Sequence, residues 1–300
     1  MTFAAQDAAS WLANPRATRE TLEAFGLATK HRLGQNFLVE DNIIRKIIRL
    51  AELTSDDVVL EVGPGLGTLT VAMLDYVRAV CSIEADRELE GVLATTCKEP
   101  HQDSFVLCMG DALKATPQLV GDAYASLGVF ADAQGKEASG ALIGPNKFVS
   151  NLPYQVAATL ILLFFQEFTT LEQAVVMVQA EVADRIAAKP GTKAYGAYTA
   201  KLALYAQVSG RFEVAPGNFM PPPRVNSAVV RLERAPMTDP SGTSVLTSEQ
   251  LAWVARVIDA AFAQRRKTIR NSMGASGFKK DTLEKAFLAA HIEPTVRAEA

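Results

Sequence analysis

The chain has 300 residues, of which 49% are hydrophobic and 21% are charged, and its formal net charge is −3. These values are typical of a globular domain. The negative net charge excludes attraction of nucleic acid by the overall charge, so contacts with nucleic acid would need a local basic cluster. No apolar run approaches the ~20 residues of a membrane-spanning helix, and the N-terminal residues lack the pattern of a secretory signal. We therefore expect a cytoplasmic protein with no membrane partner.

The first predicted helix starts at Asp41, which is a good N-cap. Apolar residues after it recur at helical spacing and would form one buried face, namely Ile44, Ile47, Ile48 and Ala51. Continuous apolar runs then predict strands that are covered on both faces. These strands are 58–62, 79–83, 105–109, 147–150 and 174–178, and helices are expected at 68–76 and 157–168. Strands that alternate with helices predict an α/β fold with a parallel, doubly wound sheet.

Three other stretches set the expected domain organisation. Residues 112–146 are rich in glycine, alanine and serine and are interpreted as containing a surface insertion. Residues 235–244 resemble a linker, and 245–300 are predicted to form a small helical domain. Its core is expected to include an apolar stripe of Trp253, Val254, Val257, Ile258 and Ala261. The expected domains are therefore an N-terminal extension over 1–28, an α/β domain over 29–235 and the helical domain.

The cysteines and histidines do not indicate a metal or disulfide framework. Cys81, Cys97 and Cys108 are odd in number and lack Cys-x-x-Cys spacing, which favours reduced structural cysteines. The three histidines are scattered without metal-ligand spacing. We therefore expect no metal site.

A glycine-rich turn follows the first strand of the sheet and opens a helix. Gly63, Gly65 and Gly67 let the backbone approach a ligand closely, although such a turn also occurs where a strand merely packs on a helix. Thr68 stands where a dinucleotide fingerprint has its third glycine, which disfavours a pyrophosphate site. The turn alone therefore leaves both interpretations open.

Polar residues at successive strand ends favour a nucleoside ligand. Glu84 could accept both ribose hydroxyls, and Asp111 could accept from an adenine amino group. No lysine or arginine in the glycine loop could meet a pyrophosphate, so a nucleoside without phosphates is favoured. S-adenosylmethionine fits this description, with Glu61 facing its cationic amino group.

The tetrapeptide Asn151-Leu152-Pro153-Tyr154 ends another apolar strand, where open α/β sheets bind ligands. The side-chain oxygen of Asn151 and the carbonyls of Leu152 or Pro153 could accept hydrogen bonds from an exocyclic amino group. Pro153 stiffens the turn, and Tyr154 offers a ring on which a flipped-out base could stack. An ordinary strand-ending turn is the alternative interpretation of the same residues.

A basic cluster lies near the middle of the expected helical domain. It consists of Arg265, Arg266, Lys267 and Arg270. A solvated helical face would explain such a run, but in a chain of negative net charge a concentrated cluster favours a phosphate-binding surface for RNA.

Six ordered motifs together carry a family resemblance. They occupy residues 34–38, 61–70, 83–86, 110–113, 151–154 and 218–229. In this arrangement the chain resembles the rRNA adenine N6,N6-dimethyltransferase family, specifically its small-subunit, kasugamycin-sensitivity type, from about residue 29 to about 294. The resemblance implies a Rossmann-like class I methyltransferase domain with one antiparallel strand, near 225–232, and a helical C-terminal domain.

The resemblance also implies an activity and a site. The activity is S-adenosylmethionine-dependent dimethylation of two adjacent adenosines in a hairpin near the 3′ end of small-subunit rRNA. It would occur during ribosome biogenesis, on a precursor small subunit, with the enzyme as a monomer. Tyr154 and Phe219 are expected to sandwich the target adenine. With the residues assigned above, the expected cofactor contacts are Asn36, Leu38, Glu61, Gly63, Gly65, Glu84, Asp111, Ala112 and Asn151.

Three alternative functions share parts of this pattern. A large-subunit rRNA methyltransferase of the macrolide-resistance type shares most motifs but usually carries Ile where Leu152 stands, and lacks the Gly-Pro-Gly-Leu-Gly form of the loop. A non-catalytic RNA-binding assembly factor on the same fold would be expected to lose parts of the Asn151–Tyr154 site, which is intact. A nicotinamide oxidoreductase is disfavoured by Thr68 and by the missing catalytic Tyr/Lys or His constellation.

Overall fold

A computed structural model describes residues 10–27, 35–129 and 143–300. The chain forms two compact units, which we call the sheet unit (up to Ala183, with Val208–Arg234) and the helical unit (Asp184–Gln207 with Ala235–Ala300). Residues 184–207, assigned to the α/β domain from the sequence, thus group with the C-terminal helices. The glycine-rich part of the expected insertion, 130–142, lies outside the described residues, as do 1–9 of the N-terminal extension.

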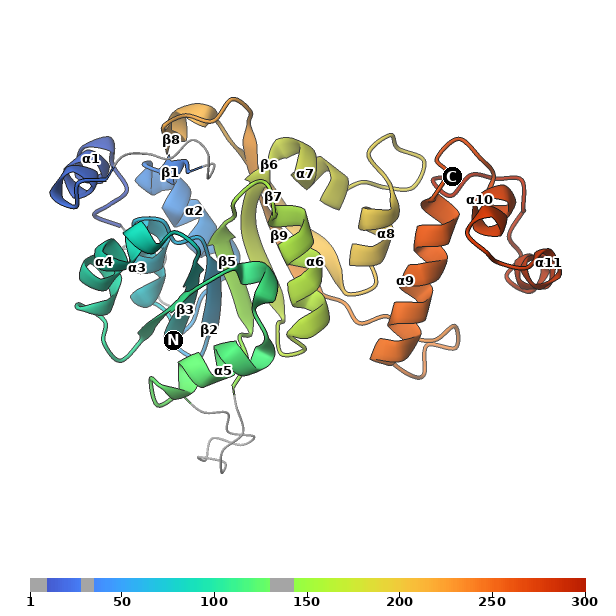
Figure 1. The fold of residues 1–300 in the computed structure, drawn as a ribbon, viewed down its shortest axis with the longest axis horizontal. Coiled ribbons are helices and arrows are strands. Elements are labelled where there is room, and N and C mark those ends of the chain that lie inside the picture. The colour runs from blue at the N-terminus through green and yellow to red at the C-terminus, as the bar shows by residue number, and fades with distance from the viewer. Residues whose placement is uncertain (1–9, 28–34, 130–142) are drawn as a thin grey trace. The chain divides into compact units, whose positions relative to one another are not determined.

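Within the described residues, seven strands form one sheet in the order β4-β3-β2-β5-β6-β9-β7 (Figure 1). The first five are mutually parallel, and β9 is antiparallel to β6. Both the parallel sheet and the antiparallel strand expected near 225–232 are confirmed, whereas β7 was not predicted. The strands are β2 Val58–Val62, β3 Ala79–Glu84, β4 Phe105–Met109, β5 Lys147–Asn151, β6 Gln173–Gln179, β7 Ala206–Val214 and β9 Ser227–Arg234.

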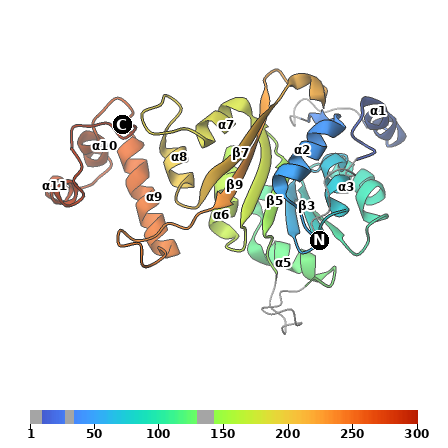
Figure 2. The ribbon, with the colours of Figure 1, turned by 180° about the vertical axis from the view of Figure 1, so that it is seen from behind.

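Helices cover both faces of this sheet. In Figure 1, α5 and α6 lie in front of the strands, and in the reverse view of Figure 2, α2 and α3 do. Every residue of β2 and β3 is buried, which is why these strands are continuous apolar runs. The helices of the sheet unit are α1 Pro15–Ala24, α2 Asp41–Ala51, α3 Thr68–Leu74, α4 Glu90–Leu93, α5 Pro117–Ala125, α6 Ala157–Glu167 and the start of α7 Ala180–Ile186.

The start of α2 corrects one sequence prediction. Glu40, not Asp41, is the N-cap, and its carboxylate accepts the backbone N–H of Asn42 at 3.2 Å. Asp41 is instead the first helical residue, where its carboxylate pairs with Arg45 at 2.6 Å and accepts the N–H of Ser10 at 3.1 Å. The sequence thus indicated a cap correctly but placed it one residue too late.

The helical unit has its own small core. α9 Ser248–Phe262 starts with a capping box between Thr247 and Gln250, and α8 Ala197–Leu202 packs against α9 through a salt bridge of 2.8 Å between Lys201 and Asp259. The prediction that Trp253 belongs to the core was wrong, because its side chain is 52% exposed. The buried core residues come mostly from α10 Ile269–Ala275 and α11 Lys280–Ala289; they are Ala260, Ile269, Met273, Leu283 and Phe287.

The three cysteines are free, and Cys81 and Cys97 are buried as expected, while Cys108 is only partly buried. Among the described residues, no helix combines the length and the apolar character needed to cross a membrane.

Cys97 has a specific packing role. Its sulfur lies so close to Gly67 that a Cβ atom placed on Gly67 would be 2.4 Å from it.

This packing yields a stability prediction. Gly67 also has φ +90°, so Gly67→Ala adds both backbone strain and a steric clash, and we expect a loss of roughly 2–4 kcal/mol in unfolding free energy. Gly128→Ala is the matched control, because Gly128 has φ +72° but open space around it, and strain alone should cost about 1 kcal/mol. Urea unfolding of both variants measures the difference, and equal losses would contradict the clash.

Candidate functional site

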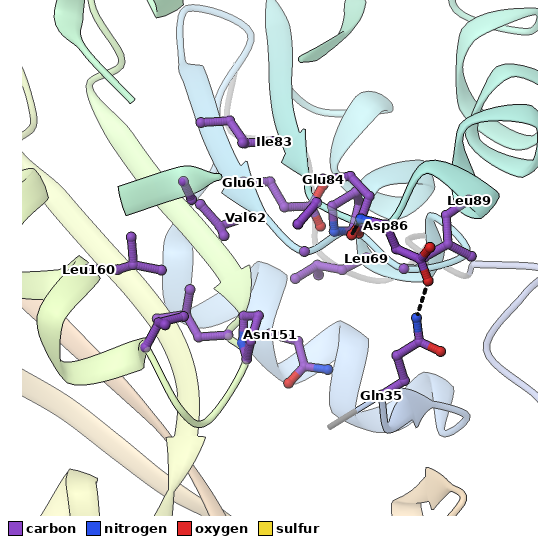
Figure 3. Close-up of a pocket in the computed structure, with 18 of the residues that line it drawn as sticks. Gln35, Glu61, Val62, Leu69, Ile83, Glu84, Asp86, Leu89, Asn151 and Leu160 are labelled. Carbon is purple, nitrogen blue, oxygen red and sulfur yellow. Dashed lines mark hydrogen bonds between the residues drawn. The ribbon is translucent and has the colours of Figure 1, made fainter. Parts of the chain in front are cut away.

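A cavity of about 260 Å³ lies where β2, β3, β4 and β5 end (Figure 3). The segment 35–38, which includes the short strand β1 Phe37–Leu38, forms another wall of the cavity. All nine expected cofactor contacts line it, and so does the whole Asn151–Tyr154 turn. The structure therefore brings together residues that lie more than a hundred positions apart, at the sheet edge where α/β folds bind ligands.

The glycine loop forms the floor between two other walls. Gly63 and Gly65 have φ +67° and +62°. A Cβ atom would come within 3.2 Å of the Pro153 ring at Gly63 and within 3.1 Å of the Phe37 ring at Gly65. The missing side chains thus let the loop touch both the β5 turn and β1.

Glu61 is a buried carboxyl at the base of the cavity. Its side chain is only 1% exposed, and its Oε2 accepts hydrogen bonds from Thr70 Oγ1 at 2.6 Å and Ser82 Oγ at 2.7 Å. Burial, partly opposed by these hydrogen bonds, raises its pKa to about 7, and the nearby Glu84 charge acts in the same direction. Figure 3 shows the two carboxyl groups in the same part of the pocket.

Glu84 ends β3 and is 7% exposed. Its Oε1 accepts the backbone N–H of Asp86 at 2.8 Å, and burial raises its pKa despite this bond. Asp86 in turn accepts a hydrogen bond from Gln35 Nε2 at 2.9 Å, which ties the N-terminal wall to the end of β3 (Figure 3). Gln35 and Asp86 lie within the sequence motifs 34–38 and 83–86 but were not predicted to have a role. The available signal was that each is a polar residue close to a predicted cofactor contact.

Asp111 follows β4 and is exposed at the rim of the cavity. Its Oδ1 accepts the N–H of Leu113 at 3.0 Å, which fixes the short helical turn that contains Ala112. The N–H of Gly110 donates to the carbonyl of Glu84 at 2.8 Å. The ends of β3 and β4 are thereby held side by side, as two contacts to one nucleoside require.

The hydrogen bonds within the Asn151–Tyr154 turn show which of its oxygen atoms are left to accept hydrogen bonds from a ligand. The Asn151 side chain donates from Nδ2 to the carbonyl of Asn36 at 3.4 Å, so its Oδ1 is the atom left to accept. The carbonyl of Pro153 already accepts the N–H groups of Val156 at 3.2 Å and Ala157 at 3.1 Å. Of the two carbonyls considered from the sequence, that of Leu152 is therefore the better placed acceptor.

The two aromatic residues expected at the target base are placed differently. Tyr154 lines the cavity, is partly buried, and its hydroxyl lies 2.6 Å from Ser227 Oγ; burial raises the pKa of its phenol. Phe219 is 3% exposed and packs in the main core, where β8 Phe219–Met220 pairs with β1 and Phe219 stands opposite Leu38. Its ring is not part of the cavity wall.

The basic cluster lies in the helical unit, with three residues between α9 and α10 and Arg270 within α10. Arg265, Arg266 and Lys267 are exposed, and Arg265 donates to the carbonyl of Lys193 at 2.9 Å. Arg270 differs, because its guanidinium pairs with Glu284 of α11 at 2.9 Å. Its charge is thus neutralised by a contact that joins two helices, which a charge run in the sequence could not reveal.

Comparisons with known proteins agree with one another. A family model described as ribosomal RNA adenine dimethylase matches residues 26–298. A ribosomal RNA small subunit methyltransferase A from Streptomyces griseus is 37% identical over 292 residues, which cover 96% of this chain and 91% of that protein. A protein of the same name from Acidothermus cellulolyticus is 38% identical over 285 residues, covering 94% and 88%.

Two solved structures share the fold. A dimethyladenosine transferase from Plasmodium falciparum has a TM-score of 0.63 at 24% identity, with 86% of this chain and 83% of that chain covered. The 23S rRNA methyltransferase ErmE has a TM-score of 0.61 at 24% identity, with 88% and 93% covered. These two likenesses establish the Rossmann-like methyltransferase architecture.

The buried carboxyl of Glu61 yields a pH prediction. Its folded-state pKa of about 7 exceeds the 4.5 of an unperturbed glutamate, so its contribution to stability is fully present below about pH 4.5 and is lost as the pH rises through 7. The total loss is about 3 kcal/mol. Glu61→Gln, a neutral side chain of similar shape, should remove this part of the decline between pH 5 and 8. Unfolding free energies measured across that range would contradict the assignment if both proteins declined equally.

Proposed function

Since the chain belongs to the ribosomal RNA adenine dimethylase family, we propose that it dimethylates N6 of two adjacent adenosines in a hairpin near the 3′ end of small-subunit rRNA. It is an S-adenosylmethionine-dependent enzyme of this family. We further propose that it acts as a cytoplasmic monomer on a precursor small subunit, during ribosome biogenesis. The observation that carries the proposal is the single cavity in which the nine expected cofactor contacts meet the Asn151–Tyr154 turn.

The residues that line the cavity fit S-adenosylmethionine. Glu84 would accept the ribose hydroxyls, Asp111 the adenine amino group, and Glu61 the cationic amino group of the methionine part. Among the described lining residues there is no lysine, arginine or histidine, which suits a cationic ligand without phosphates. When bound, S-adenosylmethionine supplies a methyl group activated by its sulfonium.

The turn after β5 would present the target base. The N6 lone pair of adenine is delocalised into the ring, so nitrogen attacks poorly unless it is oriented. Hydrogen bonds from the two N6 hydrogens to Asn151 Oδ1 and the Leu152 carbonyl would favour a tetrahedral nitrogen with its lone pair directed at the methyl group. This is catalysis by positioning, and the proton can leave to water after transfer.

Stacking would offset the cost of extruding the base. Extrusion costs a few kcal/mol, and one aromatic contact returns ~1–3 kcal/mol. Tyr154 at the cavity wall supplies one such face. A contribution from Phe219 would require its ring to leave the core, so its half of the sandwich depends on a movement when RNA binds.

Methyl transfer to unmethylated small subunits tests the proposed function. The purified protein is incubated with labelled S-adenosylmethionine and small subunits from a strain without this modification, and the modified nucleotides are mapped. We expect N6,N6-dimethyladenosine at two adjacent positions near the 3′ end of the small-subunit rRNA. A parallel reaction contains naked large-subunit rRNA. Labelling only in that reaction would support the macrolide-resistance alternative, and no transfer in either reaction would support a non-catalytic factor.

A first variant tests the orientation of N6. Asn151→Ala should lower kcat by about 10²-fold with little change in unfolding free energy, because its side chain orients the base and does not fill the core. Asn146→Ala is the matched control, since the Asn146 side chain bonds Val58 N and Asp57 at the other end of the strands. It should lower stability and leave kcat unchanged. The same pattern in both variants would contradict the orienting role.

A second variant tests the phosphate-binding surface. Changing Arg265, Arg266 and Lys267 to glutamate should weaken subunit binding and lower the slope of log affinity against log salt by roughly 3, while S-adenosylmethionine affinity stays intact. Arg270 is left in place because it pairs with Glu284.

The matched control for this charge reversal changes Arg49, Arg78 and Lys98, which are exposed and scattered over the sheet unit, to glutamate. It alters the net charge equally and should leave the salt slope nearly unchanged. If both triple variants shift the slope alike, net charge alone explains binding and Arg265–Lys267 form only a solvated face.

A further inference from the structure

Ser227 has no place in the mechanism above, yet it contacts the residue proposed to stack on the target base. It is the first residue of β9 and is completely buried. Its Oγ lies 2.6 Å from the hydroxyl of Tyr154, a short hydrogen bond between side chains 73 positions apart. A buried serine hydroxyl needs a partner, and here the partner is the outer end of a cavity-lining ring.

Tyr154 has few other constraints. It lies in the turn between β5 and α6, and the backbone hydrogen bonds of that turn are made by Pro153 with Val156 and Ala157. These bonds fix the course of the backbone but not the rotation of the Tyr154 side chain. Because the ring is only partly buried, packing alone leaves it freer than a core residue. The bond to Ser227 is the contact that fixes the far end of the ring.

The position of Ser227 is itself fixed by strand register. In the pairing of β6 with β9, Ser227 stands opposite Gln179, and the carbonyl of Asn226 accepts the N–H of Ala180 at 2.9 Å. On its other edge, β6 pairs with β5 so that Met177 stands opposite Asn151. One strand therefore sets both the amide proposed to orient N6 and, two residues further on, the hydroxyl that holds the ring.

We propose that Ser227 is a positioning residue that holds the Tyr154 ring at the angle needed for stacking the target adenine in register with Asn151. The proposal rests on the function proposed above, because it assigns Ser227 a role only through Tyr154. It predicts a specific signature. Removing either hydroxyl should free the ring, and removing both should do no more than removing one.

A double-mutant cycle on methyl transfer to unmethylated small subunits tests this. Ser227→Ala and Tyr154→Phe should each lower kcat roughly 3- to 10-fold, and the double variant should be no slower than the slower single variant. The affinity for S-adenosylmethionine, measured by calorimetry on the same proteins, should stay at the wild-type value. If Ser227→Ala folds poorly, Tyr154→Phe still tests the proposal. It removes the same hydrogen bond by changing Tyr154, which is only partly buried.

Two matched controls lose buried hydroxyls elsewhere. Tyr124→Phe removes a hydrogen bond of 2.8 Å to the carbonyl of Val59, and Ser272→Ala removes one of 2.8 Å to the carbonyl of Ala260. Both should lower thermal stability and leave kcat unchanged, which separates loss of a buried hydroxyl from loss of ring position.

The outcomes distinguish the inference from the function beneath it. Tyr154→Ala with wild-type turnover would overturn the stacking role itself, and with it the proposal for Ser227. Two other results would overturn only the positioning role, provided that Tyr154→Ala impairs turnover. In the first, the kcat losses of Ser227→Ala and Tyr154→Phe multiply in the double variant. In the second, Ser227→Ala causes no loss of kcat. A wild-type protein that does not methylate rRNA would reject the proposed function.

Discussion

The site depends on the in-register pairing of the parallel strands β2, β3, β4 and β5. Val62 stands opposite Ile83, and Glu84 opposite Met109, so the carboxyl ends of neighbouring strands meet at one edge of the sheet. A slip of one residue in any of these pairings would turn the end of that strand away from its neighbour and reverse the faces of its side chains. The cavity, its acidic side chains and the Asn151 turn all follow from this register.

The second determinant of ligand binding is the pair of acidic side chains buried in the cavity. Glu61 and Glu84 are both buried, and burial raises the pKa of each. Among the described lining residues, no lysine, arginine or histidine compensates for these carboxyl groups. A ligand that brings its own positive charge relieves this cost, whereas a pyrophosphate would add to it. Two aromatic or apolar walls, one from Phe37 and one from the Pro153 turn, close the site around the glycine loop. The charges of the pocket and its shape thus both favour a cationic ligand without phosphates.

The positions of the strands, and the residues that line the cavity, could be predicted because they follow local rules. A strand covered on both faces is a continuous apolar run, and its polar end residue marks the sheet edge, as Glu84 does. What escaped prediction depends on tertiary partners. Arg270 belongs to a basic run in the sequence but pairs with Glu284, and Phe219 belongs to the β1–β8 packing. Trp253 continues the apolar stripe of α9 but is about half exposed. No local pattern encodes such distant partners.

We propose that the carboxyl ends of these strands form an adenosine site, and a variant of Glu84 tests this proposal. Calorimetry compares S-adenosylmethionine binding by the wild-type protein and by Glu84→Gln, with circular dichroism to confirm that both are folded. If the carboxylate accepts the ribose hydroxyls, the variant should bind about 10- to 100-fold more weakly, as expected for loss of charge-assisted hydrogen bonds. Unchanged affinity in a folded variant would contradict the account.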